Sequence, residues 1–230
     1  MQLIKKTVVA TIVTVIAGLM SLSAVASVNA PENGREYHTL AQPQQTDAVG
    51  KVEVLEFFFY SCPHCNLFDP IITEWVKKQG NSIAFKRIHV DFGQGQQPLQ
   101  RLYYTLEAMG KNEELHTKIF AAIHKEHVIL RNDDDMANFV TKFGIDKRKY
   151  TEISTSFSVE SKMRRATQIM TAYHVDGVPM LAVDGHYVTA PSEVTESNPG
   201  LTELQGAQSV LKVLDALVAK VQKERGMGKK

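Results

Sequence analysis

The sequence predicts an α/β fold in which a long run of helices interrupts a β-sheet, and two patterns favour it. Residues 52–92 read as strand, helix and strand, and a helix between two buried strands indicates a parallel pair. Helical spacing then replaces strand patterning over residues 98–173, and strand signals return only at residue 180. Because about 200 residues remain after a secretory signal, one core with an insertion fits better than two complete domains.

The amino terminus predicts a secretory signal over residues 1–26. Lys5 and Lys6 give it a positive start, an apolar stretch follows, and small residues indicate cleavage between Ala26 and Ser27. The apolar stretch has about 14 residues, fewer than the ~20 that a membrane-spanning helix needs, which disfavours an uncleaved anchor. We therefore expect an exported protein, in a compartment where a disulfide persists.

The charge balance argues against a nucleic-acid partner. The chain carries 26 lysine and arginine residues against 25 aspartate and glutamate residues, and two of the lysines lie in the signal. The mature chain is therefore close to neutral and lacks the basic surplus typical of a nucleic-acid-binding domain.

Four elements are expected before the insertion. A short strand at residues 36–40 comes first. Residues 52–60 are a nearly unbroken apolar, β-prone run, which indicates a strand buried on both faces. A helix over residues 62–78 follows, because Pro63 suits the first helical position. Residues 83–92 predict the next strand.

The insertion over residues 98–173 is expected to be all-helical. Its segments share apolar helical spacing and are separated by turn-forming residues such as Gly110 and Gly144. The expected helices span residues 98–109, 112–127, 133–143, 147–156 and 158–173. Residues 27–97 and 174–230 would then be the two parts of the domain that contains the sheet.

The last part of the chain predicts a hairpin and a long helix. Strands at 180–183 and 186–188 are joined by Asp184-Gly185, a dipeptide typical of tight hairpin turns. A polar loop that contains Pro191 and Pro199 is expected next. An amphipathic helix over 203–225 and a basic tail complete the chain.

The most specific motif is Cys62-Pro63-His64-Cys65, which holds both cysteines of the chain. A disulfide between them closes a ring of four residues and adds only roughly 2 kcal/mol, against about 4.7 kcal/mol for a 100-residue loop. A disulfide in so small a ring therefore contributes little to the stability of the fold. The pair therefore indicates thiol–disulfide exchange, in which one sulfur attacks and the other resolves.

Within this motif, Cys62 is the expected nucleophile and Cys65 the resolving sulfur. Unpaired backbone N–H groups and the macrodipole at the start of a helix stabilise a thiolate at position 62. His64 adds positive charge or a hydrogen bond, and Pro63 offers no competing donor. Cys65 lies one turn inside the helix on the same face. Because a stabilised Cys62 thiolate leaves a mixed disulfide readily, the motif predicts an oxidant.

Two further candidates lie outside the motif. Glu56 is a carboxylate within an apolar strand, where it is either half-exposed or buried. A buried Glu56 would have a raised pKa and would handle protons for Cys65. Val178-Pro179 precedes a strand, where a proline is often only an edge device and where the sequence alone favours a trans bond.

Taken together, these residues resemble the DsbA family of thiol:disulfide oxidoreductases over essentially the whole mature chain. The segments that carry the resemblance are Glu56-Phe57-Phe58, Cys62-Pro63-His64-Cys65, His89-Val90-Asp91-Phe92, the long helical insertion and Gly177-Val178-Pro179. The resemblance implies a thioredoxin fold with an inserted all-helical domain. It also implies that Cys62 is the nucleophile, that Cys65 resolves and that His64 tunes the pair.

The same resemblance implies a substrate site, partners and a location. Pro179 would follow a cis peptide bond beside the active site, and the backbone of Val178 would hydrogen-bond an extended substrate. Reduced, newly exported proteins would be the clients, and a membrane quinone reductase of the DsbB type would reoxidise the protein in the periplasm. We expect a monomer that needs no cofactor and no metal.

Other interpretations are weaker. Zinc needs four ligands, but the chain has no second cysteine pair and the next histidine after the motif is His89. The aspartates at 133–135 lack the glycine of a calcium loop and fit an acidic first helical turn. A disulfide isomerase or reductase is the alternative within redox chemistry. A peptide-binding holdase with vestigial cysteines is the alternative of another class.

Overall fold

The computed structural model describes residues 30–93 and 95–227, so the expected signal at residues 1–26 lies outside the described residues. Within these residues one sheet has the strand order β1-β5-β4-β2-β3. The strands are β1 (His38–Thr39), β2 (Val52–Phe58), β3 (Ile83–His89), β4 (Met180–Val183) and β5 (Tyr187–Thr189). The α-helices are α3 (Pro63–Gln79), α4 (Gln97–Ala108), α5 (Asn112–His124), α6 (Asp133–Thr141), α7 (Lys147–Ser154), α8 (Phe157–Ala172), α9 (Pro191–Ser197) and α10 (Glu203–Glu224).

Strand β2 is the centre of the sheet and is buried along its whole length, as its apolar sequence predicts. It pairs in parallel with β3, with Glu56 beside Arg87, and antiparallel with β4. Successive side chains of a strand point to opposite faces of the sheet. Val54 therefore joins the core on one face and Leu55 the core on the other, while Glu56 projects to the same face as Val54.

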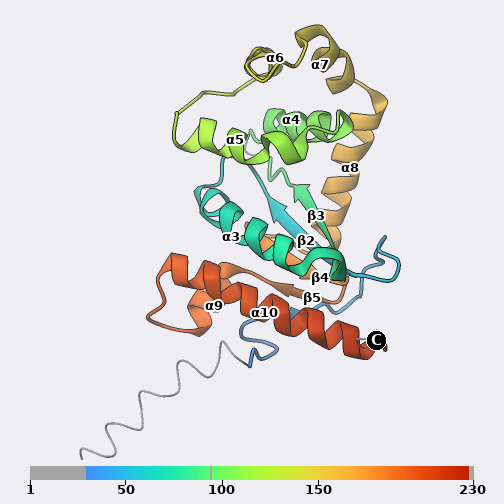
Figure 1. The fold of residues 1–230 in the computed structure, drawn as a ribbon, viewed down its shortest axis with the longest axis vertical. Helices are drawn as coiled ribbons and strands as arrows, with labels where there is room; N and C mark the ends of the chain where they lie inside the picture. Colours follow the sequence, from blue (N-terminus) through green and yellow to red (C-terminus); the bar gives the residue numbers. More distant parts are fainter. Residues whose placement is uncertain (1–29, 94, 228–230) are drawn as a thin grey trace, which may run out of the picture.

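Helices cover both faces of the sheet (Figure 1). On one face α3 and α10 pack over β2, where Phe68, Ile72 and Leu214 belong to one buried cluster. The indole Nε1 of Trp75 in α3 donates a 2.8 Å hydrogen bond to Asp215 in α10, which ties the two helices together. On the other face the end of α8 contributes Ile169 and Met170. Helix α3, which begins at the cysteine motif, therefore packs against both the sheet and α10.

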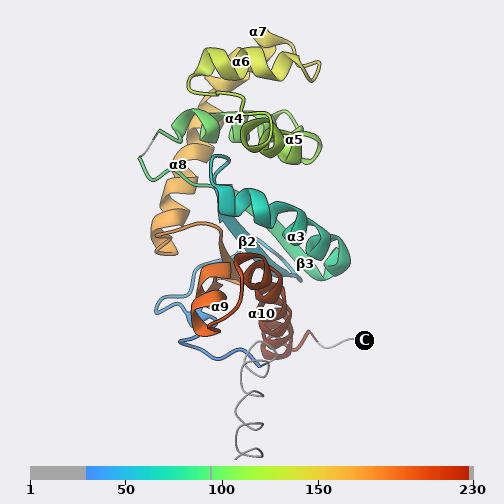
Figure 2. The same cartoon turned by 90° about the vertical axis from the view of Figure 1, so that its left-hand side faces the viewer.

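Helices α4 to α8 all lie between β3 and β4 in the chain, which matches the expected all-helical insertion. Figures 1 and 2 show α4 and α5 between α3 and the outer pair α6 and α7. The largest buried cluster joins these helices to Phe58, Tyr60, Cys62 and Cys65. The helical part is therefore packed directly on the residues around the cysteine motif. The expected domain boundaries at residues 97 and 173 stay a prediction.

One expectation about the carboxy-terminal part is wrong. The segment after β5 was expected to be a polar loop, but it contains the helix α9. Pro191 starts this helix with its preset backbone angle, and Val194 is buried against α10. The approach of the two helices is close: a Cβ at Gly206 would lie 2.0 Å from the Thr195 hydroxyl oxygen. Short helices that depend on such packing have little signal of their own.

The remaining differences concern the ends of elements. Strand β2 ends at Phe58 rather than at residue 60, and β3 ends at His89 rather than at residue 92. Helix α5 stops at His124, three residues early, and the first strand has two residues only. The Asp184-Gly185 turn is confirmed, with both residues at positive φ.

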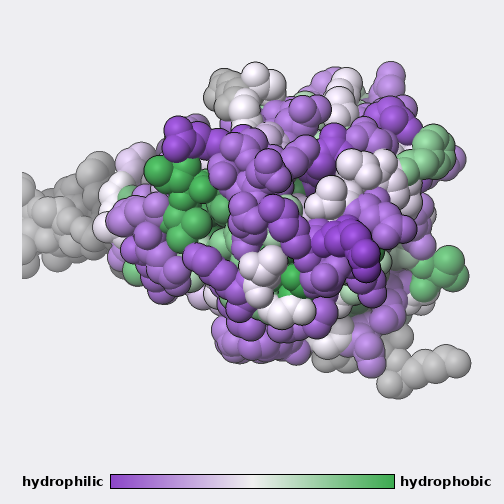
Figure 3. Space-filling view, turned by 90° about the horizontal axis from the view of Figure 1, so that it is seen from above, coloured by the Kyte–Doolittle hydropathy of each residue, from purple (hydrophilic) through white to green (hydrophobic). Residues whose placement is uncertain are grey.

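The face of the molecule that Figure 3 shows is mostly polar. Figure 3 shows the molecule from above Figure 1, with hydrophilic side chains broken by separate hydrophobic patches. Among the residues that the structure describes, the large apolar side chains that are exposed are Val49, Ile129, Phe157 and Leu204. Scattered exposed apolar residues are normal for a folded domain.

Candidate active site

Cys62 is the N-cap residue of α3, so the expected position of the motif at a helix start is confirmed. Its backbone is extended (φ −80°, ψ 118°), and Pro63 occupies the first turn. The backbone N–H of Cys65 donates a 3.2 Å hydrogen bond to the sulfur of Cys62. A sulfur in the capping position thus accepts a bond that a helix start otherwise leaves unmade.

The two sulfurs, both free thiols, have opposite environments. A hydrogen bond from the Cys65 thiol lowers the pKa of Cys62 to about 7, and the backbone N–H groups of Cys65 and His64 and the charge of His64 act in the same direction. Burial opposes these effects without cancelling them. Burial raises the pKa of Cys65, and the thiolate of Cys62 raises it further. Cys62 is therefore the sulfur that ionises first.

The Val178–Pro179 peptide bond is cis, as the resemblance implied, and it lies beside the cysteine motif. The Cys62 thiol donates to the carbonyl oxygen of Val178 across 3.6 Å. Val178 and Pro179 line a pocket of about 280 Å³. Its lining is completed by His64, Leu67, Phe68, Pro191, Ser192, Thr195, Glu196, Glu203 and Ala207. The pocket therefore opens next to the sulfur that ionises first.

His64 has a partner that the sequence did not indicate. Its Nδ1 lies 2.5 Å from Oε1 of Glu203, the first residue of α10. The hydrogen bond that His64 donates to Glu203 raises the pKa of His64, and burial opposes this. The imidazole ring is thus held by a carboxylate from another helix, and its effect on Cys62 comes from its charge and its backbone.

Glu56 is buried, with 2% of its surface exposed, so the half-exposed alternative is wrong. Burial raises the pKa of Glu56, although Arg87 opposes this with a 2.8 Å hydrogen bond from its Nε. The charge of Glu56 contributes to the raised pKa of Cys65. A carboxyl group with a raised pKa close to the inner sulfur is suited to accept and return a proton.

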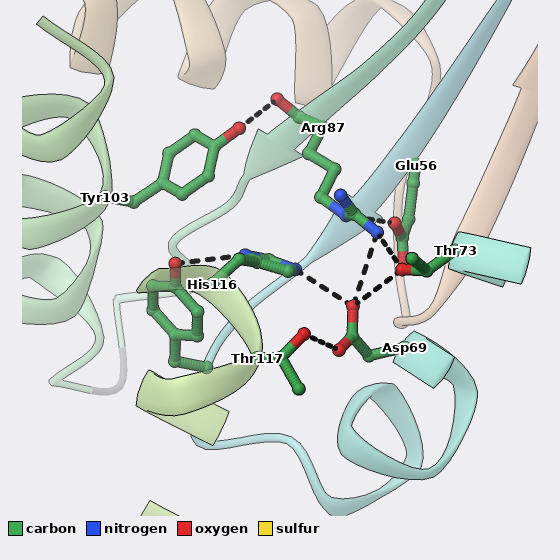
Figure 4. A network of polar contacts seen from close by, with 8 residues as sticks. Glu56, Asp69, Thr73, Arg87, Tyr103, His116 and Thr117 are labelled. Carbon is green, nitrogen blue, oxygen red and sulfur yellow. Dashed lines mark hydrogen bonds and ion pairs between the residues drawn. The ribbon is translucent and has the colours of Figure 1, made fainter. Parts of the chain in front are cut away.

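Glu56 belongs to a buried polar network that the sequence did not reveal (Figure 4). Arg87 bridges Glu56 to Asp69 of α3, and Nη2 of Arg87 lies 3.3 Å from Oδ1 of Asp69. Asp69 also meets Nε2 of His116 at 3.3 Å and accepts a 2.9 Å hydrogen bond from Thr117. Burial alone would raise the pKa of Asp69, but His116, Arg87 and Thr117 hold it below its ordinary value. The network joins the sheet, α3 and α5.

Tyr60, two residues before Cys62, is held by three histidines. Its hydroxyl lies 3.0 Å from Nδ1 of His116, and its backbone N–H donates to Nε2 of His89 at 3.2 Å. Nε2 of His124 lies 2.8 Å from its carbonyl oxygen. These three histidines thus fix the backbone that leads into the motif.

Part of this network left a signal in the sequence. Asp69 lies four residues after Cys65, on the face of α3 that also carries Phe68 and Ile72, so a carboxylate at a core position was recognisable. The pairing of Glu56 with Arg87 depends on the register of two strands, which the sequence does not state. Glu203 meets His64 across 139 residues, and no local pattern indicates such a contact.

Comparison with known proteins identifies the family. Residues 53–217 match the family of DSBA-like thioredoxin domains. The chain therefore belongs to the DsbA-like thioredoxin family. The thiol:disulfide interchange protein DsbA of Burkholderia cepacia is 40% identical over 209 residues, which cover 90% of this chain and 94% of that protein. The DsbA of Pseudomonas aeruginosa strain PAO1 is 35% identical over 197 residues, which cover 86% and 87%.

Solved DsbA structures are similar as well. The crystal structure of Pseudomonas aeruginosa DsbA matches with a TM-score of 0.76 and 34% identity, over 84% of this chain and 95% of that one. The oxidoreductase DsbA from Xylella fastidiosa matches with a TM-score of 0.74 and 25% identity, over 84% and 98%. The chain is thus a DsbA-like thiol:disulfide oxidoreductase with a thioredoxin fold that a helical insertion interrupts, as expected.

Among residues 30–93 and 95–227, no three His, Cys, Asp or Glu side chains are grouped so that they could hold a metal ion. None of the helices described there is both long enough and apolar enough to cross a membrane.

Proposed function

We propose that this DsbA-like protein is an exported dithiol oxidase that donates the Cys62–Cys65 disulfide to reduced client proteins. The observation that carries the proposal is the asymmetry of the two sulfurs. Cys62 caps a helix and has a pKa lowered to about 7, whereas the pKa of the buried Cys65 is raised. Reduction of the disulfide therefore produces a stabilised thiolate at Cys62, which favours transfer of electrons from the client to the protein.

The reaction proceeds by two displacements at sulfur. A client thiolate attacks Cys62 in the oxidised pair, the bond between Cys62 and Cys65 breaks, and Cys65 leaves with its electron pair and takes up a proton. The second client thiolate then attacks the client sulfur of the mixed disulfide and expels Cys62 as a thiolate. The client gains a disulfide and loses two electrons, which remain on the reduced pair.

Three other residues have assigned parts in this proposal. Glu56 gives a proton to Cys65 as that sulfur leaves and removes it when the disulfide forms again, which its burial and raised pKa support. His64 stabilises the Cys62 thiolate by its charge. The backbone of Val178, beside Pro179, hydrogen-bonds an extended client in the pocket next to Cys62.

The clients and the regenerating partner follow from the family resemblance. We propose that newly exported proteins are the clients, that the site of action is the periplasm, and that a membrane quinone reductase of the DsbB type reoxidises Cys62–Cys65. The expected secretory signal and the oxidising compartment support this arrangement. The protein would act as a monomer without nucleic acid or a cofactor.

The deciding experiment measures the redox equilibrium and the direction of transfer. The purified protein is equilibrated with mixtures of reduced and oxidised glutathione, and the oxidised form is then mixed with reduced ribonuclease. We expect the disulfide to be far easier to reduce than a structural one, and ribonuclease to gain disulfides in step with loss of Cys62–Cys65. A disulfide that glutathione does not reduce would contradict the proposal.

Two variants separate this function from its alternatives. In Cys65→Ser, the Cys62 thiolate should attack a disulfide of scrambled, oxidised ribonuclease, release one client thiolate and accumulate as a mixed disulfide, because no Cys65 thiol remains to resolve it. Cys62→Ser should lose transfer completely. Client folding that persists with Cys62→Ser would favour a holdase. Efficient repair of scrambled ribonuclease together with poor oxidation of reduced ribonuclease would favour an isomerase.

A further inference from the structure

The contact between His64 and Glu203 joins the cysteine motif to a helix that has no assigned part in the reaction. We propose that Glu203 is a positioning residue that acts on Cys62 through His64, by keeping the imidazole charged and orienting it at the edge of the pocket. The inference rests on the proposed function, because it specifies how the oxidising strength of Cys62 is set.

The geometry of the contact is that of a charge-assisted hydrogen bond. Nδ1 of His64 and Oε1 of Glu203 are 2.5 Å apart, and both side chains line the pocket beside Cys62. Both side chains are more than half exposed, so solvent screens the pair and its effect is moderate. A carboxylate at this distance favours the charged form of the imidazole and directs the ring along the Nδ1–Oε1 line.

The fold places Glu203 at this point by three independent contacts. Thr202 and Gln205 form a reciprocal capping box, which fixes where α10 begins. Gly206 allows α10 to approach α9 closely, since a Cβ there would collide with the Thr195 hydroxyl. The bond between Trp75 and Asp215 holds α10 against α3, the helix that carries His64. The first residues of the two helices are thus held next to each other.

The charged groups near His64 act on Cys62 with opposite signs. The sulfur of Cys62 faces His64 on its own helix, Glu203 faces it from α10, and Glu196 of α9 lines the same pocket. A charged imidazole stabilises a thiolate, whereas a carboxylate destabilises it. His64 lies two residues after Cys62 in the chain, and its charge lowers the pKa of Cys62. The indirect effect of Glu203 through His64 should therefore exceed its direct effect.

The sign of one pKa shift tests this mechanism. In reduced Glu203→Gln, the pKa of His64 measured by NMR should fall by roughly 0.2 to 0.7 units, the range for an exposed ion pair. The pKa of Cys62, measured by thiolate absorbance, should rise by a smaller amount. Glu196→Gln removes an equal charge from the same pocket and is the matched control, in which the pKa of His64 should shift much less.

A double variant separates the indirect effect from a direct one. In a His64→Gln background, the further change Glu203→Gln should no longer raise the pKa of Cys62 and should lower it slightly, because only the repulsion by the carboxylate remains. Two results would overturn the proposal: an unchanged pKa of His64 in Glu203→Gln, or a lowered pKa of Cys62 in that single variant.

These measurements are independent of client oxidation. They use the reduced protein alone. A failure of the ribonuclease assay would reject the proposed function, while the pKa measurements would still decide the role of Glu203. Conversely, a protein that oxidises ribonuclease but shows no pKa coupling would keep its function and lose this inference. A thermal unfolding curve of Glu203→Gln that matches the unchanged protein confirms that the variant is folded.

Discussion

The two cysteines lie three residues apart, yet the start of α3 treats them differently. Cys62 occupies the capping position, where backbone N–H groups point at its sulfur, and Cys65 is enclosed inside the first turn. The two side chains are chemically identical, but the free energy needed to ionise them differs, because burial penalises a charge that no hydrogen-bond donor compensates. The asymmetry is a property of position within a helix rather than of residue type.

This asymmetry predicts a pH-dependent stability of the reduced form. The pKa of Cys62 is about 7 in the folded protein and about 8.5 in an unfolded chain. Its stabilisation is complete above the unfolded pKa and is lost as the pH falls through 7. Between pH 5.5 and pH 8 the reduced protein should gain on the order of 1 kcal/mol from this group. Urea unfolding at both pH values measures the gain.

Cys62→Ser is the control for this titration, since it leaves the other titrating groups in place. The variant should lack the gain between the two pH values. An equal gain in the variant and in the unchanged protein would show that other groups cause it.

Glu56 allows a second test at the scale of one residue. Glu56→Gln removes the proton-transfer group while keeping shape and hydrogen-bonding capacity, so the steps in which Cys65 leaves or re-enters the disulfide should slow by at least about tenfold. Stopped-flow measurement of disulfide exchange with a dithiol client follows these steps.

The same strand offers the matched control for Glu56. Glu53 is also buried and pairs with Lys86 at 2.7 Å, but it projects to the opposite face of β2. Glu53→Gln should leave the exchange rates unchanged. Equal rates for Glu56→Gln and the unchanged protein, together with an equal redox equilibrium, would remove the proton-transfer role.

At the scale of elements, the contact between α9 and α10 determines where the pocket lies. Pro191 and Thr195 of α9 line the pocket, and Gly206 of α10 packs against the same two residues. The backbone carbonyl of Pro191 would lie 3.1 Å from a Cβ at position 206. Only a residue without a side chain allows this approach. Gly206 does not line the pocket itself, but it determines how closely α10 approaches the pocket-lining residues of α9.

Gly206→Ala should therefore destabilise the protein by roughly 1–3 kcal/mol, the usual cost of overpacking. Thermal unfolding measures the loss. The exposed substitution Gln208→Ala on the same helix is the control and should have little effect. The double variant Gly206→Ala with Thr195→Ala should recover part of the loss, because the nearest clash is removed. Full stability of Gly206→Ala alone would contradict the close approach.

The sequence predicted helices and strands better than it predicted the contacts between them. The helices from α4 to α8 have strong apolar spacing, and their expected and observed ranges differ by a few residues. Helix α9 was missed because it is short and takes its stability from α10. The motif was recognisable because its chemistry lies within four residues, whereas the histidines around Tyr60 lie 29, 56 and 64 residues away.

At the scale of the whole molecule, the helical part and the sheet meet around Tyr60 and the buried network. His89 ends β3 and accepts the backbone N–H of Tyr60, and His116 of α5 contacts both the Tyr60 hydroxyl and Asp69. Burial lowers the pKa of both histidines. The junction therefore contains two buried imidazoles whose charged form is disfavoured, and His89 in particular stays neutral in the folded protein until the pH falls toward 3.

His89 gives this junction a measurable acid sensitivity. Burial lowers its pKa to about 3, against an ordinary value of 6.5, so below pH 6.5 the unfolded chain binds a proton that the folded chain does not. Stability must then fall as the pH decreases between these two values. From pH 6.5 to pH 4.5 this group should cost about 2–3 kcal/mol. Urea unfolding of the oxidised protein at both pH values excludes any contribution from a Cys62 thiolate.

The comparison with His89→Gln isolates this contribution from that of the carboxylates. Glutamine keeps an acceptor for the Tyr60 N–H but does not titrate, so the variant should lose about 2–3 kcal/mol less than the unchanged protein over the same pH range. His38 is exposed and serves as the matched position. His38→Gln should leave the acid loss as it is. If His89→Gln loses as much stability in acid as the unchanged protein, His89 is not neutral in the folded protein, and other groups at the junction cause the acid loss.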